Sequence, residues 1–106
     1  YDRAGVPRPD LVLGAEQPPE RRKPAPWPLQ EIMRRFSLEA KDLLMVDDMP
    51  HGGVMARAMG VDFACAGWYG MLPDIEENMR RQCDFFFSTV EAFARFLFGD
   101  ENAIAE

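Results

Sequence analysis

Short apolar runs bounded by polar residues recur along the chain. Each run is too short for a helix, and such runs are typical of strands in a parallel sheet. Strands are therefore predicted over residues 10–14, 43–46, 61–67 and 85–87. The run at 43–46 is continuously apolar, which favours burial on both faces of the sheet. The run at 10–14 ends in glycine and is followed by a polar loop broken by proline.

Between these runs, apolar residues recur every three or four positions, which predicts helices. The first helix is predicted to begin at Pro28, because Pro24 and Pro26 prevent an earlier start. Its apolar face consists of Leu29, Ile32, Met33 and Phe36. The second helix is predicted over residues 52–59, and Gly60 is suited to end it in the left-handed conformation.

Two further helices are predicted from capping boxes, in which a capping residue is followed three positions later by glutamate. Asp74 with Glu77 predicts a helix over residues 75–81, and Ser88 with Glu91 predicts another before the end of the chain. Strands alternating with helices at this spacing predict an α/β fold, a parallel sheet flanked by helices. We expect one domain over residues 1–99 and a flexible tail over residues 100–106.

Composition narrows the classes of partner. The 106 residues are 47% hydrophobic, which suffices for a core, and 12 basic against 18 acidic side chains give a net charge of −6. Because sequence-independent nucleic-acid binding needs a dominant cationic face, we expect no nucleic-acid partner. We see no bilayer-spanning run and no signal-peptide run, so we expect a cytoplasmic protein without a membrane partner. Cys65 and Cys83 lack metal-binding spacing and are expected to be buried thiols.

The candidate chemistry lies in two motifs. Lys23 begins a Lys-Pro-Ala-Pro segment, and Asp47 and Asp48 directly follow the predicted strand at 43–46. Ligands of open parallel sheets collect at the carboxyl ends of the strands, so we expect Lys23 and Asp48 to meet there. Paired carboxylates suit Mg²⁺, and a lysine offsets the charge of a transferring phosphoryl group. The alternative is that one aspartate caps the next helix and the other is solvated.

These motifs resemble the haloacid dehalogenase-like (HAD) hydrolase superfamily, in its phosphoglycolate-phosphatase-like branch. Residues 10–14 resemble its third core strand, and Lys23-Pro-Ala-Pro26 resembles its third motif, whose lysine steadies the phosphoryl group and the aspartyl nucleophile. Val46-Asp47-Asp48 resembles its fourth motif. The resemblance implies that Lys23 is catalytic and binds phosphate, that Asp48 is the principal Mg²⁺ ligand, and that Asp47 stands where glycine is often found.

Two departures from the family pattern change what is expected. Many members carry a second acidic residue four positions beyond Asp48, where this chain has Gly52. Either Asp47 compensates as a metal ligand, or metal affinity is reduced. The chain also contains no Asp-x-Asp, so the nucleophile, the Ser/Thr motif and the cap domain would lie before Tyr1. The resemblance therefore implies a partial Rossmann-like sheet that lacks the N-terminal nucleophile strand and the cap domain.

The leading hypothesis is a C-terminal fragment of a Mg²⁺-dependent HAD-like phosphatase. The parent enzyme would hydrolyse a small phosphorylated metabolite through an aspartyl-phosphate intermediate, and this chain alone is predicted to be inactive. Phosphonatase and dehalogenase chemistry stay open, although the acidic pair favours phosphoryl transfer. A phosphoacceptor receiver domain is disfavoured, because its acidic pair would precede its lysine.

The alternative hypothesis is a non-catalytic, truncated or split-gene fragment that acts as a binding or assembly module. If the family's strand order holds, the missing first strand would leave the strand at 43–46 with an exposed inner edge. Exposed strand edges recruit other chains. We therefore expect self-association or pairing with the missing N-terminal half.

Overall fold

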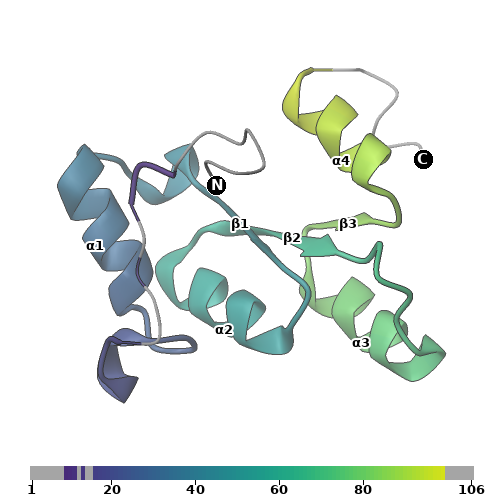
Figure 1. The fold of residues 1–106 in the computed structure, drawn as a ribbon, viewed down its shortest axis with the longest axis horizontal. Helices are drawn as coiled ribbons and strands as arrows, with labels where there is room; N and C mark the ends of the chain where they lie inside the picture. The colour runs from purple at the N-terminus through teal and green to yellow at the C-terminus, as the bar shows by residue number, and fades with distance from the viewer. Residues whose placement is uncertain (1–8, 12, 14–15, 100–106) are drawn as a thin grey trace.

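The structure, a computed structural model, describes residues 9–11, 13 and 16–99. The described part is α/β, with a three-stranded parallel sheet and helices on both of its faces (Figure 1). The predicted fold class is confirmed. The elements in chain order are the 3₁₀ helix η1 (Pro19–Arg21), α1 (Trp27–Phe36), the 3₁₀ helix η2 (Ala40–Asp42), β1 (Leu44–Asp47), α2 (Pro50–Met59), β2 (Asp62–Ala66), α3 (Pro73–Gln82), β3 (Phe85–Phe87) and α4 (Val90–Leu97).

The three strands lie side by side in chain order, β1-β2-β3. Leu44 pairs with Asp62 at one end of the sheet, and Asp47 pairs with Cys65 near the other. Because both pairings are parallel, the carboxyl ends of all three strands face the same edge of the sheet. That edge receives the segment that joins β1 to α2, which begins with Asp48.

The core has two parts, one on each face of the sheet, because neighbouring residues of a strand point to opposite faces. Phe63 and Cys65 of β2 belong to the cluster that contains residues of α1, α2 and α3. Ala64 of β2 belongs to the second cluster, with Phe87 of β3 and Ala92 of α4. The helix α4 therefore covers the opposite face of the sheet from α2, as Figure 1 shows.

β1 is less covered than its sequence predicted. It was expected to be buried on both faces, but Val46 is 37% exposed. The reason is that α4 packs against β3, at the far side of the sheet from β1. Among the described residues, β1 also pairs with β2 alone, so its other side is an unpaired edge.

The predicted strand over residues 10–14 is not found at its described positions. Asp10, Leu11 and Leu13 carry no strand, and Val12 and Gly14 lie outside the described residues. A strand needs a neighbour for its backbone hydrogen bonds, and in the described part of the sheet β1, β2 and β3 pair only with one another. The predicted flexible tail, residues 100–106, also lies outside the described residues.

Helix ends show where capping predictions succeeded and failed. Gly60 ends α2 with φ +69°, as predicted. The two predicted capping boxes are wrong: α3 begins after Leu72 with Pro73 in its first turn, and α4 is capped by Thr89. Proline is suited to the first helical turn because its missing N–H has no partner there in any case, so Asp74 is not needed as a cap.

Two further expectations concern the membrane and the cysteines. No helix of the described residues is long and apolar enough to cross a membrane. Both thiols are free; Cys65 is fully buried and Cys83 is half-buried. The expectation of buried thiols is therefore confirmed for Cys65 and holds only in part for Cys83.

Candidate active site

Lys23 is placed by a compact turn between η1 and α1. The N–H of Arg22 donates to the carbonyl of Pro19 at 3.2 Å, and the N–H of Ala25 donates to the carbonyl of Arg22 at 2.9 Å. The peptide bond between Lys23 and Pro24 is cis. From this turn the ammonium Nζ of Lys23 donates to Oδ2 of Asp47 at 2.5 Å, which joins residues 24 positions apart.

Asp47 is the last residue of β1, and both of its carboxylate oxygens are engaged. Oδ2 accepts from Lys23, while Oδ1 accepts from the backbone N–H groups of Asp48 at 2.7 Å and Met49 at 3.2 Å. Its side chain is only 9% exposed, against 43% for Lys23. The carboxylate is therefore held by its neighbours from two sides and is largely screened from solvent.

The pKa of Asp47 reflects this environment. Burial alone would raise the pKa of the carboxyl, but the hydrogen bond and charge of Lys23 and the two backbone donors outweigh burial. The pKa of Asp47 is consequently held below its ordinary value. Asp47 is a carboxylate at neutral pH, and it presents a fixed negative charge to the lysine.

Asp48 follows Asp47 in the chain but has a different environment. Its side chain is exposed, and within the described part of the chain its carboxylate has no hydrogen bond or ion pair. The expectation that Lys23 lies at the carboxyl end of β1 is confirmed. The carboxylate that it contacts, however, is Asp47 and not Asp48.

Gly52 lies directly beside this ion pair. A Cβ atom at position 52 would stand 2.6 Å from both Cβ and Oδ2 of Asp47, which is closer than real Cβ contacts. The residue belongs to the first turn of α2 and is buried. Sequence reasoning considered Gly52 only as a missing acidic residue and did not find this contact. A signal was present, since glycine inside a helix is unfavourable unless packing requires it.

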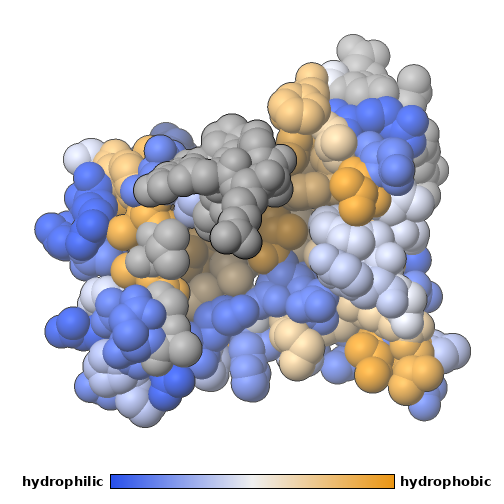
Figure 2. Space-filling view, viewed as in Figure 1, coloured by the Kyte–Doolittle hydropathy of each residue, from blue (hydrophilic) through white to orange (hydrophobic). Residues whose placement is uncertain are grey.

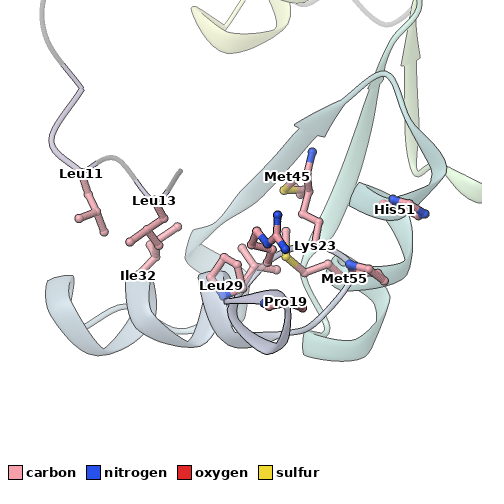
Figure 3. A pocket seen from close by; sticks show the side chains of 12 residues that line it. Leu11, Leu13, Pro19, Lys23, Leu29, Ile32, Met45, His51 and Met55 are labelled. Atoms are coloured by element: carbon pink, nitrogen blue, oxygen red, sulfur yellow. The ribbon is translucent and has the colours of Figure 1, made fainter. Parts of the chain in front are cut away.

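A cavity of about 730 Å³ adjoins Lys23 between α1, α2 and β1. Figure 3 shows Lys23 beside Met45 and Met55, with Leu11 and Leu13 over α1 at one end and His51 at the other. Most of the lining is apolar, and Arg22, Lys23 and His51 supply its polar side chains. Figure 2 shows that the middle of this face of the molecule is hollowed and has apolar atoms within it.

Three other charged or polar residues near the site, Arg21, Arg22 and His51, have ordinary surroundings. The guanidinium of Arg21 lies over the ring of Trp27, 5.0 Å from its centroid, so Arg21 packs on α1 and does not extend toward Asp47. His51 is exposed in the first turn of α2. Arg22 and His51 both line the cavity.

The residues present fit a metal ion only in a limited way. Among residues 9–11, 13 and 16–99, no three His, Cys, Asp or Glu side chains are grouped to hold a metal. Asp47 is committed to Lys23 and to two backbone donors, which leaves the exposed Asp48 as the available carboxylate of the pair. Mg²⁺ is commonly held by one or two carboxylates together with water and substrate phosphate, so Asp48 fits as one ligand.

Comparison with known proteins gives one match. A family model described as haloacid dehalogenase-like hydrolase matches residues 10–66, which is more than half of the 106 residues. The matched span contains Lys23, the Asp47-Asp48 pair, β1 and β2. Neither the curated proteins nor the solved structures gave a match.

Proposed function

Because the chain belongs to the haloacid dehalogenase-like hydrolase family, we propose that it is the C-terminal part of the catalytic core of a phosphatase. Its substrate is a small phosphorylated metabolite, as in the phosphoglycolate-phosphatase-like branch that the motifs resemble. The single observation that carries the proposal is the contact between Lys23 and Asp47 at the carboxyl end of β1. It places a lysine and an acidic pair at the sheet edge where open α/β folds bind ligands.

Lys23 is the phosphate-binding and catalytic residue of this proposal. Its side chain is 43% exposed, so it is within reach of a ligand, and its turn and Asp47 restrict where it points. A fixed positive charge stabilises the negative charge that spreads over phosphoryl oxygens during transfer. The lysine acts through its position and charge, and no proton transfer is required of it.

Asp48 is the proposed Mg²⁺ ligand. It is exposed and lies beside the ion pair in the chain, so a cation bound to it would be near the phosphate that Lys23 contacts. Bound Mg²⁺ would add positive charge at the phosphoryl oxygens and orient them. Asp48 provides one oxygen donor group, and the other ligands would be water, substrate and groups outside the described residues.

The covalent step requires a group that these residues do not supply. The sequence contains no Asp-x-Asp, so a carboxylate nucleophile must come from another segment or another chain. That carboxylate would attack phosphorus, the ester oxygen would leave with a proton, and water would then hydrolyse the acyl phosphate. The 106-residue chain by itself is expected to release no phosphate from any phosphomonoester.

The test measures phosphate release from p-nitrophenyl phosphate and a panel of small phosphomonoesters. It uses the polypeptide encoded by the complete reading frame around these residues, with Mg²⁺. Lys23→Ala should lower kcat by about 10²- to 10³-fold, the effect of removing one charge-stabilising donor. Asp48→Asn should weaken the response to Mg²⁺, because a ligand is lost.

Two surface substitutions serve as matched controls. Lys41→Ala removes an exposed lysine that pairs with Glu39, and Asp62→Asn removes an exposed carboxylate at the opposite end of the sheet. Both should leave the rate unchanged. Unchanged rates in Lys23→Ala and Asp48→Asn as well would contradict the proposed site.

A second proposal is assembly, and the observation that favours it is the unpaired edge of β1. Val46 of the same strand is exposed on one face of the sheet, and the apolar cavity adjoins the strand. We propose that this edge pairs with a strand of the N-terminal half or of a second copy. Sedimentation velocity of the 106-residue chain should show a species larger than a monomer. The proposal would be contradicted if the chain stayed monomeric at high concentration and did not bind an added N-terminal half.

A further inference from the structure

We infer that Asp47 is a positioning residue for Lys23 and not a metal ligand, and that Gly52 is the residue that makes room for it. The two aspartates thus have different roles: Asp47 holds the ammonium of Lys23 in place, and Asp48 alone is available to bind a cation. The catalytic role given to Lys23 rests on the proposed function. The ion pair between Lys23 and Asp47 and the close approach of Gly52 to Asp47 do not rest on it, and they are tested separately.

The first argument is the state of the Asp47 oxygens. Oδ2 accepts from Lys23 at 2.5 Å, and Oδ1 accepts from two backbone N–H groups. These three donors occupy three of the about four lone-pair sites of the carboxylate, so a metal could reach only the remaining site on Oδ2, directly beside the positive charge of Lys23. The carboxylate of Asp48 accepts no hydrogen bond from any described residue.

The second argument is steric. The Asp47 side chain fills the space that a side chain at position 52 would enter, with Asp47 Cβ, Oδ2 and Cγ all within 2.9 Å of a Cβ built there. The Cβ atom among them is fixed to the backbone of β1 and cannot move without moving the strand. In this backbone, side chains at positions 47 and 52 therefore exclude each other.

The exclusion and the hydrogen bonds of Asp47 together bear on the two consequences that the glycine at position 52 left open, compensation by Asp47 or reduced metal affinity. An acidic residue at 52 is incompatible with an aspartate at 47 in this backbone. Asp47 does not stand in for the missing acidic residue, because its oxygens face Lys23 and the backbone of the next turn. The structure thus points to reduced metal affinity with a single carboxylate ligand.

The steric part is tested by a double-mutant cycle on the unfolding of the 106-residue chain in urea. Gly52→Ala should lower the unfolding midpoint in the unaltered chain, because its Cβ meets Asp47. In an Asp47→Gly background the same change should raise the midpoint, since alanine is the better helix former once the contact is gone. The sign of the effect therefore reverses. A shift of equal sign and size in both backgrounds would overturn the inference.

Gly53→Ala is the matched control. It lies in the same helix, but its Cβ would meet the ring of Phe63 at 3.0 Å and not Asp47. Its effect on the midpoint should be the same with aspartate or glycine at position 47. If Gly52→Ala alone does not fold, folding of the Asp47→Gly/Gly52→Ala chain supports the inference, and failure of that chain to fold contradicts it.

The metal part is tested by titrating the chain with Mn²⁺ and measuring the paramagnetic broadening of its backbone NMR signals. The Lys23→Met/Asp47→Asn chain removes both members of the ion pair without changing the net charge, so a change in affinity would report ligation and not charge. This chain should bind Mn²⁺ as the unaltered chain does, and Asp48→Asn should not. Equal losses in both variants would overturn the inference.

Absence of Mn²⁺ binding in the unaltered chain as well would contradict the assignment of a cation to Asp48. Neither measurement uses phosphatase activity. The inference therefore fails or holds separately from the proposed function, which is tested by the rates of Lys23→Ala and Asp48→Asn.

Discussion

β1 and β2 are neighbouring parallel strands with very different surroundings. Phe63 of β2 is 2% exposed and Cys65 is fully buried, whereas Val46 of β1 is 37% exposed. β2 has a strand on each side and helix-borne side chains on each face. β1 has one strand beside it in the described part, and a cavity adjoins it.

The difference shows where stability and chemistry are placed in this fold. The central strand contributes Phe63, Ala64 and Cys65 to the core, while the charged candidates gather where the outer strand ends. A lysine at the edge stays reachable by a ligand because little packs over it. The predictions below test this division between a packed strand and an open one.

The largest expected effect is the loss of the central aromatic side chain. Phe63→Ala should lower the free energy of unfolding by about 3–5 kcal/mol, because it removes a fully packed ring and leaves a cavity. Val46→Ala should cost no more than about 1 kcal/mol, since much of that side chain already meets water. Urea unfolding of both variants provides the measurement.

The same pair of variants also tests the assembly proposal. If an added strand covers β1, Val46→Ala should become more costly in the assembled protein, and Phe63→Ala should not change its cost. Equal costs for the two variants in the isolated chain would remove the distinction between the strands.

The buried thiol of β2 predicts a pH dependence. Burial raises the pKa of Cys65 to about 12, whereas an unfolded thiol has a pKa of about 8.5. Between these values the folded chain keeps a proton that the unfolded chain loses, so stability is complete below the unfolded pKa and falls as pH rises. The fall should not exceed about 1.4 kcal/mol per pH unit.

Unfolding free energies measured at a series of alkaline pH values check this effect. Cys65→Ala should flatten the decline more than Cys83→Ala, because Cys83 is only half-buried. Rapid reaction of Cys65 with a thiol reagent in the folded chain would contradict the burial on which this prediction depends.

The smallest expected effect is the loss of a helix cap. The hydroxyl oxygen of Thr89 accepts from the N–H of Ala92 at 3.1 Å, so Thr89→Ala should cost about 1 kcal/mol. Ser88→Ala should stay within about 0.5 kcal/mol, because the serine is exposed and precedes the cap. A larger loss of unfolding free energy in Ser88→Ala would instead support the capping box that the sequence predicted.

Much of the fold follows from patterns that act locally. The apolar stripe from Leu29 to Phe36, the glycine at 60 and the phenylalanine run at 85–87 each predict an element that the structure contains. The features that the sequence did not predict depend on which elements lie next to each other in the fold. The exposure of Val46 results from the position of α4, and the strand predicted at 10–14 has no partner in the described sheet.

The candidate site divides in the same way. The spacing of the motifs placed Lys23 at the carboxyl end of β1, because parallel topology brings such segments together. Choosing between Asp47 and Asp48 as its partner required the direction of each side chain, which two adjacent residues at a strand end do not reveal. The contact of Gly52 with Asp47 is likewise a property of the turn between β1 and α2.

The mutual exclusion at positions 47 and 52 constrains how such proteins can diverge. In a lineage with aspartate at 47, a side chain at 52 is tolerated better after residue 47 has become glycine, and the reverse change is tolerated better with glycine already at 52. The least destabilising route between the two arrangements therefore passes through an intermediate with glycine at both positions.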